Sequence, residues 1–224
     1  MSIPNGRFRQ RRTKEVSVVK IGIIGAGHIG GTAARLFARV GHEVAVSNSR
    51  GPSSLGSLVA SIGGNARTET PEGAAKFGEV VLLAIPWRKM DELPPGELFA
   101  GKIAVDAMNP YSPIGRVMDL GDRTSSEDTA KRMPDARLVK AFNTMGWQTL
   151  ETGPRPSAPA EDRLAIFVAG DDKDAKAVVA KLIEDIGFAP IDTGSLREGG
   201  RRQQPGSRVY GRPMTARDAR NLLR

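Results

Sequence analysis

Short apolar runs alternate with amphipathic and glycine-rich stretches along most of the chain. Aliphatic and β-branched runs predict strands at 16–24, 43–47, 79–85, 102–107, 137–142, 164–169 and 188–192. Most of these runs lack polar alternation, which is typical of strands buried on both faces of a parallel sheet. Apolar residues at three- and four-residue spacing predict helices at 29–40, 55–62 and 172–186. The pattern therefore predicts an α/β protein with a doubly wound, mostly parallel sheet and helices on both faces.

The composition is that of an ordinary globular chain. Its 224 residues are 39% hydrophobic and 26% charged, which is enough apolar material for a sizeable core. No apolar run approaches the ~18–20 residues of a membrane-spanning helix, so no such helix is predicted. The chain has no cysteine, which excludes disulfide scaffolds, thiolate metal sites and cysteine nucleophiles. With only two histidines as well, the sequence predicts no metal site.

The net charge of +8 is concentrated at the two ends. Residues 1–20 carry six basic side chains and one acidic, and residues 197–224 carry eight arginines and two acidic side chains. The part between them has more acidic than basic residues. Basic ends are often solvated arms, aromatic residues make up only 5%, and no recognition motif accompanies the arginines. Nucleic acid is therefore not expected as a partner.

A glycine motif follows the first predicted strand and opens the first predicted helix. It reads Gly25-Ala26-Gly27-His28-Ile29-Gly30 and fits the G-x-G-x-x-G fingerprint in the required strand–turn–helix context. In that fingerprint Gly25 allows the tight turn, Gly27 allows the pyrophosphate to approach the backbone, and Gly30 allows close helix–strand packing. The alternative is a glycine turn that only packs closely. The context favours a Rossmann-type dinucleotide site.

The end of the second predicted strand selects the dinucleotide. An NAD-binding chain usually has Asp or Glu there for the ribose 2′-hydroxyl, whereas this chain has Asn48, Ser49 and Arg50. Ser49 and Arg50 can bond a 2′-phosphate that a carboxylate would repel. A solvated Arg50 in a polar turn is the alternative. We expect NADP(H).

Several segments, in order along residues 20–196, resemble one family: IGIIGAGHIGGTAARLFARVGHEVAVSNSRGP, VVLLAIPW, VDAMNP, LVKAFNT and DTGSL. The chain resembles the NADP-dependent oxidoreductases that include NADPH:coenzyme F420 reductases, F420 being an 8-hydroxy-5-deazaflavin. The resemblance implies a Rossmann sheet with a small C-terminal portion, a cytoplasmic homodimer, and hydride transfer between NADP(H) and the deazaflavin. The arginine- and proline-bearing stretch after Gly199 departs from the regular helical segment expected of that family.

The resemblance also implies where the ligands lie. Nucleotide contacts are expected from Ala26, His28, Ile29, Asn48, Ser49 and Arg50, with Ile85, Pro86 and Trp87 along the nicotinamide. Beside the reacting rings it places Ala141, Phe142, Asn143 and Thr144. Trp87 and Asn109 follow strand ends, where an open α/β sheet forms its ligand crevice, so both are candidate catalytic residues. A buried lid position is the alternative for Trp87.

The acceptor is less constrained than the cofactor. Neither His28 nor His42 is placed to protonate a carbonyl, so a ring acceptor that needs no strong acid suits the site. The second hypothesis is an NADPH-dependent reductase of a small carbonyl or imine, with Lys140 as the proton donor. The third is a non-catalytic NADP(H) sensor that docks through its arginine-rich end. Tyr210 is either a lid of the pocket or without a role.

Three parts of the chain are expected from these patterns. Residues 1–15 form a flexible basic arm, residues 16–145 an NADP-binding Rossmann domain, and residues 146–224 a portion that completes the sheet and covers the active site. The proline-rich stretch 153–162 is an exposed loop or a seam. The ending after Leu196 is expected to be an extended, largely irregular cover.

Overall fold

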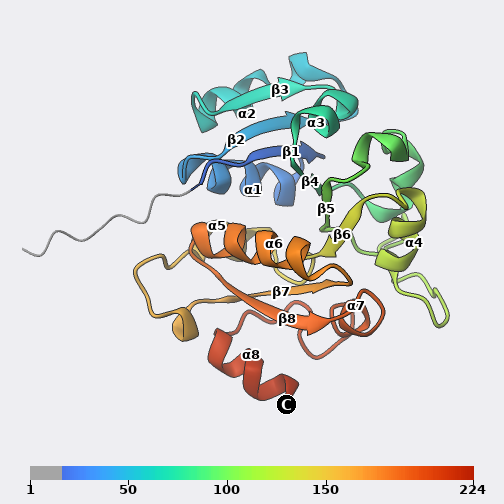
Figure 1. Ribbon diagram of the computed structural model, residues 1–224, viewed down its shortest axis with the longest axis vertical. Helices are drawn as coiled ribbons and strands as arrows, with labels where there is room; N and C mark the ends of the chain where they lie inside the picture. The colour runs from blue at the N-terminus through green and yellow to red at the C-terminus, as the bar shows by residue number, and fades with distance from the viewer. Residues whose placement is uncertain (1–16) are drawn as a thin grey trace, which may run out of the picture.

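Eight strands form a single sheet in a computed structural model that describes residues 17–224 (Figure 1). The predicted arm 1–15 lies outside the described residues. The strand order is β3-β2-β1-β4-β5-β6-β7-β8. The strands are β1 Lys20–Ile24, β2 Glu43–Ser47, β3 Ala66–Glu69, β4 Val80–Leu83, β5 Ile103–Asp106, β6 Arg137–Lys140, β7 Ala165–Gly170 and β8 Ala189–Gly194. This order is that of a Rossmann-type sheet, which confirms the predicted fold class.

Helices cover both faces of the sheet (Figure 1). The α-helices are α1 His28–Arg39, α2 Gly56–Ile62, α3 Pro71–Phe77, α4 Ser125–Arg132, α5 Trp147–Thr152, α6 Lys173–Asp185, α7 Glu198–Arg202 and α8 Ala216–Leu223. Four short 3₁₀ helices are η1 Pro52–Leu55, η2 Trp87–Glu92, η3 Gly96–Phe99 and η4 Ala160–Asp162. One core joins α1, α5 and α6 to the sheet, and a second joins α3, η2, η3 and α4 to the opposite face.

Burial on both faces explains why the strands read as continuous apolar runs. In β4, Val80 and Leu82 contribute to the core beneath α1, while Val81 and Leu83 contribute to the core beneath α3. Successive strand side chains point to opposite faces, so both sets have to be apolar. The helix starts follow local rules too, since Thr70 caps α3 ahead of Pro71, as its sequence indicates.

The sequence pattern does not reveal two features of the sheet. The edge strand β3 has the sequence ARTE, and its half-exposed residues give no apolar run that would reveal it. β7 joins β6 antiparallel through two registered residue pairs, whereas the other neighbouring strands are parallel. Strands buried on both faces carry the same pattern in either direction, so the sequence could not distinguish the two.

The predicted irregular ending is confirmed only in part. Residues 203–215 are irregular, but α7 and α8 flank them, and α8 packs Ala216 and Ala219 against β7 and β8 in a third core cluster. Thr215 caps α8 by accepting a bond from the Asp218 N–H. The ending looked irregular because glycine, proline and arginine dominate residues 199–213, which include most of α7 and most of the stretch between the two helices. The arginine-rich end is therefore part of the folded body, and the proline-rich stretch 153–162 is, as expected, a largely exposed loop.

A buried ion pair fixes the ends of two neighbouring strands. The Lys140 Nζ at the end of β6 lies 3.3 Å from Oδ2 of Asp106 at the end of β5, and both side chains are fully enclosed. Lys140 also donates to the Met108 carbonyl (3.0 Å), and Asp106 accepts from the Met108 N–H (2.9 Å) and the Ser126 hydroxyl (2.6 Å). These bonds fix the turn after β5, because both the N–H and the carbonyl of Met108 are bonded to a buried side chain. Asp106 thus satisfies a backbone N–H.

Replacing Lys140 with Ala leaves the Asp106 carboxylate buried without its counter-charge. We expect the free energy of unfolding to fall by about 3–5 kcal/mol, the usual cost of breaking a buried pair. Urea denaturation followed by circular dichroism measures the change. The matched control is Lys131→Ala, which breaks an exposed pair with Asp128 and is expected to cost less than about 1 kcal/mol. Equal losses for the two variants would contradict the role of the buried pair.

Candidate functional site

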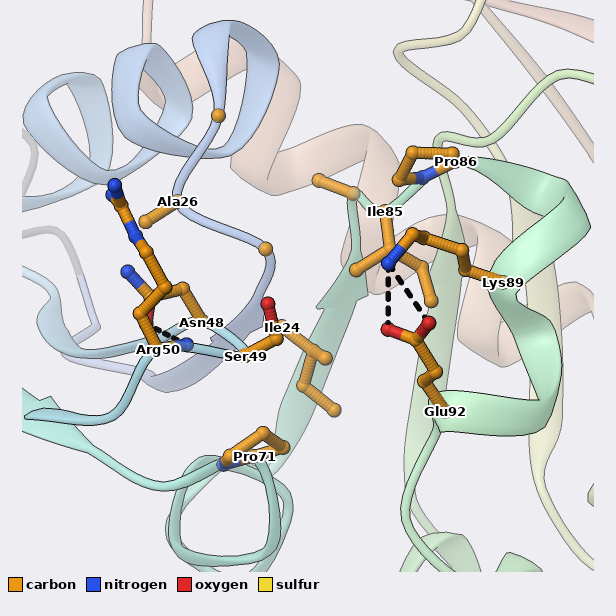
Figure 2. A pocket seen from close by; sticks show the side chains of 13 residues that line it. Ile24, Ala26, Asn48, Ser49, Arg50, Pro71, Ile85, Pro86, Lys89 and Glu92 are labelled. Carbon is orange, nitrogen blue, oxygen red and sulfur yellow. Dashed lines mark hydrogen bonds and ion pairs between the residues drawn. The ribbon is translucent and has the colours of Figure 1, made fainter. Parts of the chain in front are cut away.

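A crevice lies at the carboxyl ends of the central parallel strands. Its first hollow, of about 320 Å³, lies between the Gly25–Gly27 turn, the loop after β2 and the Ile85-Pro86 segment after β4 (Figure 2). Its second hollow, of about 390 Å³, extends past His28 and Ile29 to Asn109 and Tyr111. Both hollows are lined by Gly27, Ala84, Ile85 and Pro86, so they adjoin across the Ile85-Pro86 segment.

The three motif glycines have different surroundings. Gly25 has a φ of +108° in the tight turn, a conformation that L side chains rarely adopt. A Cβ at Gly30 would lie 1.8 Å from the Gly25 carbonyl oxygen, so Gly30 allows the helix to pack against the turn. A Cβ at Gly27 would meet no atom within 4 Å. The space beside Gly27 is therefore open to a ligand that approaches the backbone.

The start of α1 suits an anion. Gly27 precedes the helix, no side chain caps its first N–H groups, and its first turn carries no acidic residue. Uncapped N–H groups and the positive end of the helix dipole together bind phosphate. The His28 ring lies at this helix start and stacks on Trp147, with 4.6 Å between ring centroids and 12° between ring planes. The residues fit the pyrophosphate of a dinucleotide.

The loop after β2 is organised by Asn48. Its side-chain oxygen accepts from the Arg50 N–H (2.9 Å), and its amide nitrogen donates to the Ser54 hydroxyl (2.9 Å). Arg50 is exposed, and its guanidinium extends beside Ala26 on the wall of the first hollow (Figure 2). Ser49 lines the same hollow. A hydroxyl and a guanidinium at this place can bind a phosphate on the adenosine ribose.

The far wall of the first hollow includes residues that the sequence did not single out. Lys89 and Glu92 in η2 form an ion pair of 2.8 Å that faces the Arg50 side (Figure 2). Pro71, at the start of α3, closes the hollow below them. In the sequence, these residues were marked only by following a strand end within a few positions. That is a weak indication, because the loops after strands differ in length.

The second hollow is apolar with a few polar side chains. Its apolar lining includes Ile29, Ala84, Ile85, Pro86, Ala107 and Met108. Its polar side chains are His28, Arg88, Asn109 and Tyr111, with no carboxylate. Sequence reasoning missed Tyr111, although it follows Asn109-Pro110 directly.

Asn109 is held by a reciprocal bond to Asn143. The Asn109 amide nitrogen donates to the Asn143 carbonyl (2.9 Å), and the Asn143 amide nitrogen donates to the Asn109 side-chain oxygen (3.1 Å). Phe142, immediately before Asn143, has a φ of +66°. A bulky residue rarely adopts that conformation, and it is retained where the surroundings enforce it. The turn after β6 is thus shaped to bring Asn143 to Asn109.

The structure brings most of the predicted cofactor residues to the crevice. In the first hollow are Gly25, Ala26, Gly27, Asn48, Ser49, Arg50, Ile85 and Pro86, and in the second are His28, Ile29 and Asn109. The others do not line either hollow: Gly30, Trp87, Lys140, Ala141, Phe142, Asn143 and Thr144. Gly30 and Asn143 act through residues that do, and direct contact of these residues with a ligand stays a prediction.

Trp87 and Lys140 are the candidate catalytic residues that the fold turns away from the crevice. Trp87 is 8% exposed, and its indole N–H donates to the Ser125 carbonyl (3.1 Å) beneath α4. Lys140 is enclosed in the buried pair with Asp106, and burial lowers the pKa of its ammonium while the carboxylate opposes that shift. An indole–nicotinamide contact and proton donation by Lys140 stay predictions, and the burial of both side chains does not favour them.

Residues 17–224 contain neither a cluster of metal ligands nor a membrane-spanning helix. Among residues 17–224, no group of three or more His, Asp or Glu side chains gathers closely enough to hold a metal ion. No helix in that part of the chain is both long enough and apolar enough to cross a membrane.

Comparison with solved structures supports the fold. A hypothetical protein from Sinorhizobium meliloti is 32% identical and has a TM-score of 0.78, covering 88% of this chain and 96% of its own. A protein from Arthrobacter sp. FB24, named as a candidate F420-dependent NADP reductase, is 24% identical with a TM-score of 0.71. That alignment covers 88% of this chain and 99% of the other, and it supports the fold alone.

Among curated proteins, the chain is similar to the metalloreductase STEAP3 of Rattus norvegicus. The two are 30% identical over 178 residues, which are 79% of this chain and 34% of the relative. The chain therefore spans about a third of the length of the curated relatives it matches.

The family comparison covers the part of the chain that builds the nucleotide wall. Residues 20–110 match the family model described as NADP oxidoreductase, coenzyme F420-dependent. They include the glycine turn, the Ser49-Arg50 loop, the Ile85-Pro86 segment and Asn109, all of which line the crevice. Over residues 20–110 this chain thus matches the family of NADP oxidoreductases described as coenzyme F420-dependent.

Proposed function

We propose that this oxidoreductase transfers a hydride from NADPH to a ring-type acceptor, most specifically the deazaflavin coenzyme F420. The observation that carries the proposal is the two-part crevice, in which a nucleotide-binding hollow adjoins a second, largely apolar hollow. NADPH would supply the hydride. The protein would contribute by holding the two rings in a reactive arrangement and excluding water, which accounts for much of the rate of such reactions.

The NADP(H) preference is supported by the charge at the end of β2. Arg50 and Ser49 line the hollow where the adenosine ribose would lie, and no acidic residue stands among residues 48–50. A guanidinium can bind a phosphate through two parallel hydrogen bonds, which an NADH ribose cannot accept in the same way. The glycine turn and the start of α1 would hold the pyrophosphate.

The deazaflavin is supported by the lining of the second hollow. Its walls are mostly aliphatic, and they carry no carboxylate and no lysine. A flat conjugated ring can pack on such walls and accept a hydride at a ring carbon. The family description names this coenzyme as well.

A flavin is the second candidate acceptor, favoured by the similarity to a metalloreductase. Nicotinamide donates an electron pair, whereas metal ions accept single electrons, and a flavin can connect the two. The other two hypotheses have less support. The carbonyl or imine reductase depended on Lys140 as the donor, which is enclosed, and the sensor depended on a separate arginine-rich tail, which is folded onto β7 and β8.

We also infer a cytoplasmic homodimer from the resemblance to the family. The two-subunit state can be measured by analytical ultracentrifugation of the full chain.

The first test is spectrophotometric, with purified protein, NADPH and oxidised F420. We expect the visible absorption band of the deazaflavin to bleach with NADPH and to remain with NADH at the same concentration. A parallel cuvette contains FMN in place of F420. Bleaching of FMN alone would move the proposal to flavins, and bleaching with NADH as readily as with NADPH would contradict the cofactor preference.

Replacing Arg50 with Ala tests the 2′-phosphate site. We expect the binding free energy of NADPH to weaken by about 1.5–3 kcal/mol, the usual contribution of a charge-assisted bond, while that of NADH hardly changes. Quenching of tryptophan fluorescence measures both dissociation constants. Arg39→Ala, at the opposite end of α1, is the control for removing one positive charge. Similar losses for both nucleotides would show that Arg50 does not bind the 2′-phosphate.

Replacing Gly27 or Gly30 with Ala distinguishes an effect on NADPH binding from an effect on the stability of the fold. At Gly27 the added methyl group enters open space, so the melting temperature should hold while NADPH affinity falls by about 1.5–3 kcal/mol through lost phosphate contacts. At Gly30 the methyl group collides with the Gly25 carbonyl, so the fold itself should be destabilised, by about 1–3 kcal/mol. Thermal melting and NADPH titration distinguish the two effects. Unchanged NADPH affinity in Gly27→Ala would contradict the pyrophosphate assignment.

A further inference from the structure

The polar side chains of the second hollow differ in what they can still bond. The Asn109 side chain uses its oxygen and one of its two amide N–H groups in the reciprocal bond with Asn143, and an amide does not give up a proton at ordinary pH. The Arg88 guanidinium does not release a proton at ordinary pH. His28 stacks on Trp147 at the start of α1, where the pyrophosphate would lie. Tyr111 is therefore the polar side chain of this hollow that is best able to give a proton to a ligand.

The Tyr111 hydroxyl lies 3.1 Å from the hydroxyl of Tyr210. Each phenol has one proton and two lone pairs, and a single bond between two phenols uses only one of the two protons. When Tyr210 is the donor, the Tyr111 proton remains available to a ligand. Burial raises the pKa of Tyr210, and the bond to Tyr111 adds to that effect. Tyr210 therefore keeps its proton and can donate it to the Tyr111 oxygen.

Two hydrogen bonds to backbone carbonyls fix the segment that carries Tyr210 close to the second hollow. Tyr111 follows the turn after β5, and Tyr210 belongs to the segment between α7 and α8. The Gly211 N–H donates to the Thr144 carbonyl (2.9 Å), and the Asn143 side chain donates to the Gln203 carbonyl (2.9 Å). The segment that carries Tyr210 is therefore fastened to the turn after β6, next to Asn109.

We propose that the Tyr111 hydroxyl, positioned by Tyr210, binds the polar edge of the hydride acceptor and supplies the proton that the acceptor takes up with the hydride. The inference rests on the proposed hydride transfer and deepens it. A ring carbon of the acceptor gains the hydride, and the electron pair it displaces reaches a conjugated nitrogen or oxygen. That atom takes the Tyr111 proton as the phenol O–H bond breaks. Tyr111 then regains a proton from Tyr210, and Tyr210 from water.

The inference narrows the class of acceptor. The acceptor must carry a nitrogen or oxygen that becomes protonated on reduction, and in the proposed deazaflavin that atom lies at the edge of the flat ring. A metal ion that accepts a single electron takes up no proton, so it would not need the Tyr111 proton. Tyr111 is thus a candidate catalytic residue, and Tyr210 is a positioning residue.

The first arm of the test does not depend on turnover. Because the chain contains only two tyrosines, protein labelled with ¹³C at the tyrosine Cζ atoms gives two signals, which Y111F and Y210F assign. Oxidised F420 is added to protein saturated with NADP⁺, which carries no hydride to transfer. We expect the Tyr111 signal to move with the F420 titration, and F420 to bind Y111F about threefold to tenfold more weakly, as expected for one lost hydrogen bond. Binding of F420 without movement of the Tyr111 signal would overturn the proposal.

The second arm measures the proton. In the wild-type protein we expect kcat to fall at alkaline pH, where the phenol that supplies the proton has lost it. In Y111F we expect this alkaline fall in kcat to disappear. The kcat of Y111F should also drop about a hundredfold, as for a lost general acid, with NADPH affinity unchanged. Y210F should give a smaller loss and a shifted limb. An unaltered pH profile in Y111F would overturn the proposal. Melting temperatures of both variants establish that they fold, and the wild-type NMR arm stands if one does not.

The two proposals fail in different ways. Wild-type reduction of FMN or a cyclic imine, without reduction of F420, would contradict the deazaflavin, and Tyr111 would then be tested on the acceptor that reacts. Reduction of F420 with Y111F equal to wild type would contradict only the role of Tyr111. Reduction of none of the three acceptors would overturn both.

Discussion

The crevice depends on one buried ion pair. Lys140 and Asp106 lie side by side at the ends of β6 and β5, and both bond the backbone of Met108. A turn held through its N–H and its carbonyl cannot rotate as a unit. That turn leads directly to Asn109 and Tyr111 in the second hollow. The desolvation of the two charges is offset by their attraction and their further hydrogen bonds, which a buried pair needs to be tolerated.

The nucleotide half of the site could be predicted from the sequence because its parts are local. The glycine motif, the helix that it opens and the Ser49-Arg50 loop all lie within about one strand–helix–strand unit. The β2 bounds match the predicted strand, and the other buried strands were located to within a few residues. Short β-branched runs that end at turn residues are typical of strands in a sheet covered on both faces.

The acceptor half could not be predicted in the same way, because its contacts join distant parts of the chain. Tyr111 and Tyr210 are 99 positions apart, and Asn143 meets Gln203 across 60. No periodicity or motif reports such pairs. Trp87 illustrates the converse, since its place after a strand end suggested the crevice but its indole bonds the Ser125 carbonyl in the opposite core. Strand-end position fixes where the backbone is, whereas the side-chain direction depends on the 3₁₀ turn that follows.

The C-terminal segment connects these two observations. Its arginines and glycines gave it the composition of a solvated tail, yet Val209, Ala216 and Ala219 bury it against β7 and β8. Once α8 is anchored, the stretch between α7 and α8 is held close to the turn after β6 by the Gly211 and Gln203 bonds. Half-buried Tyr210 then reaches Tyr111 without needing a helix of its own. Tyr111 of the second hollow is thus supported from behind by a loop, and neither the helical pattern nor the glycine motif could indicate that contact.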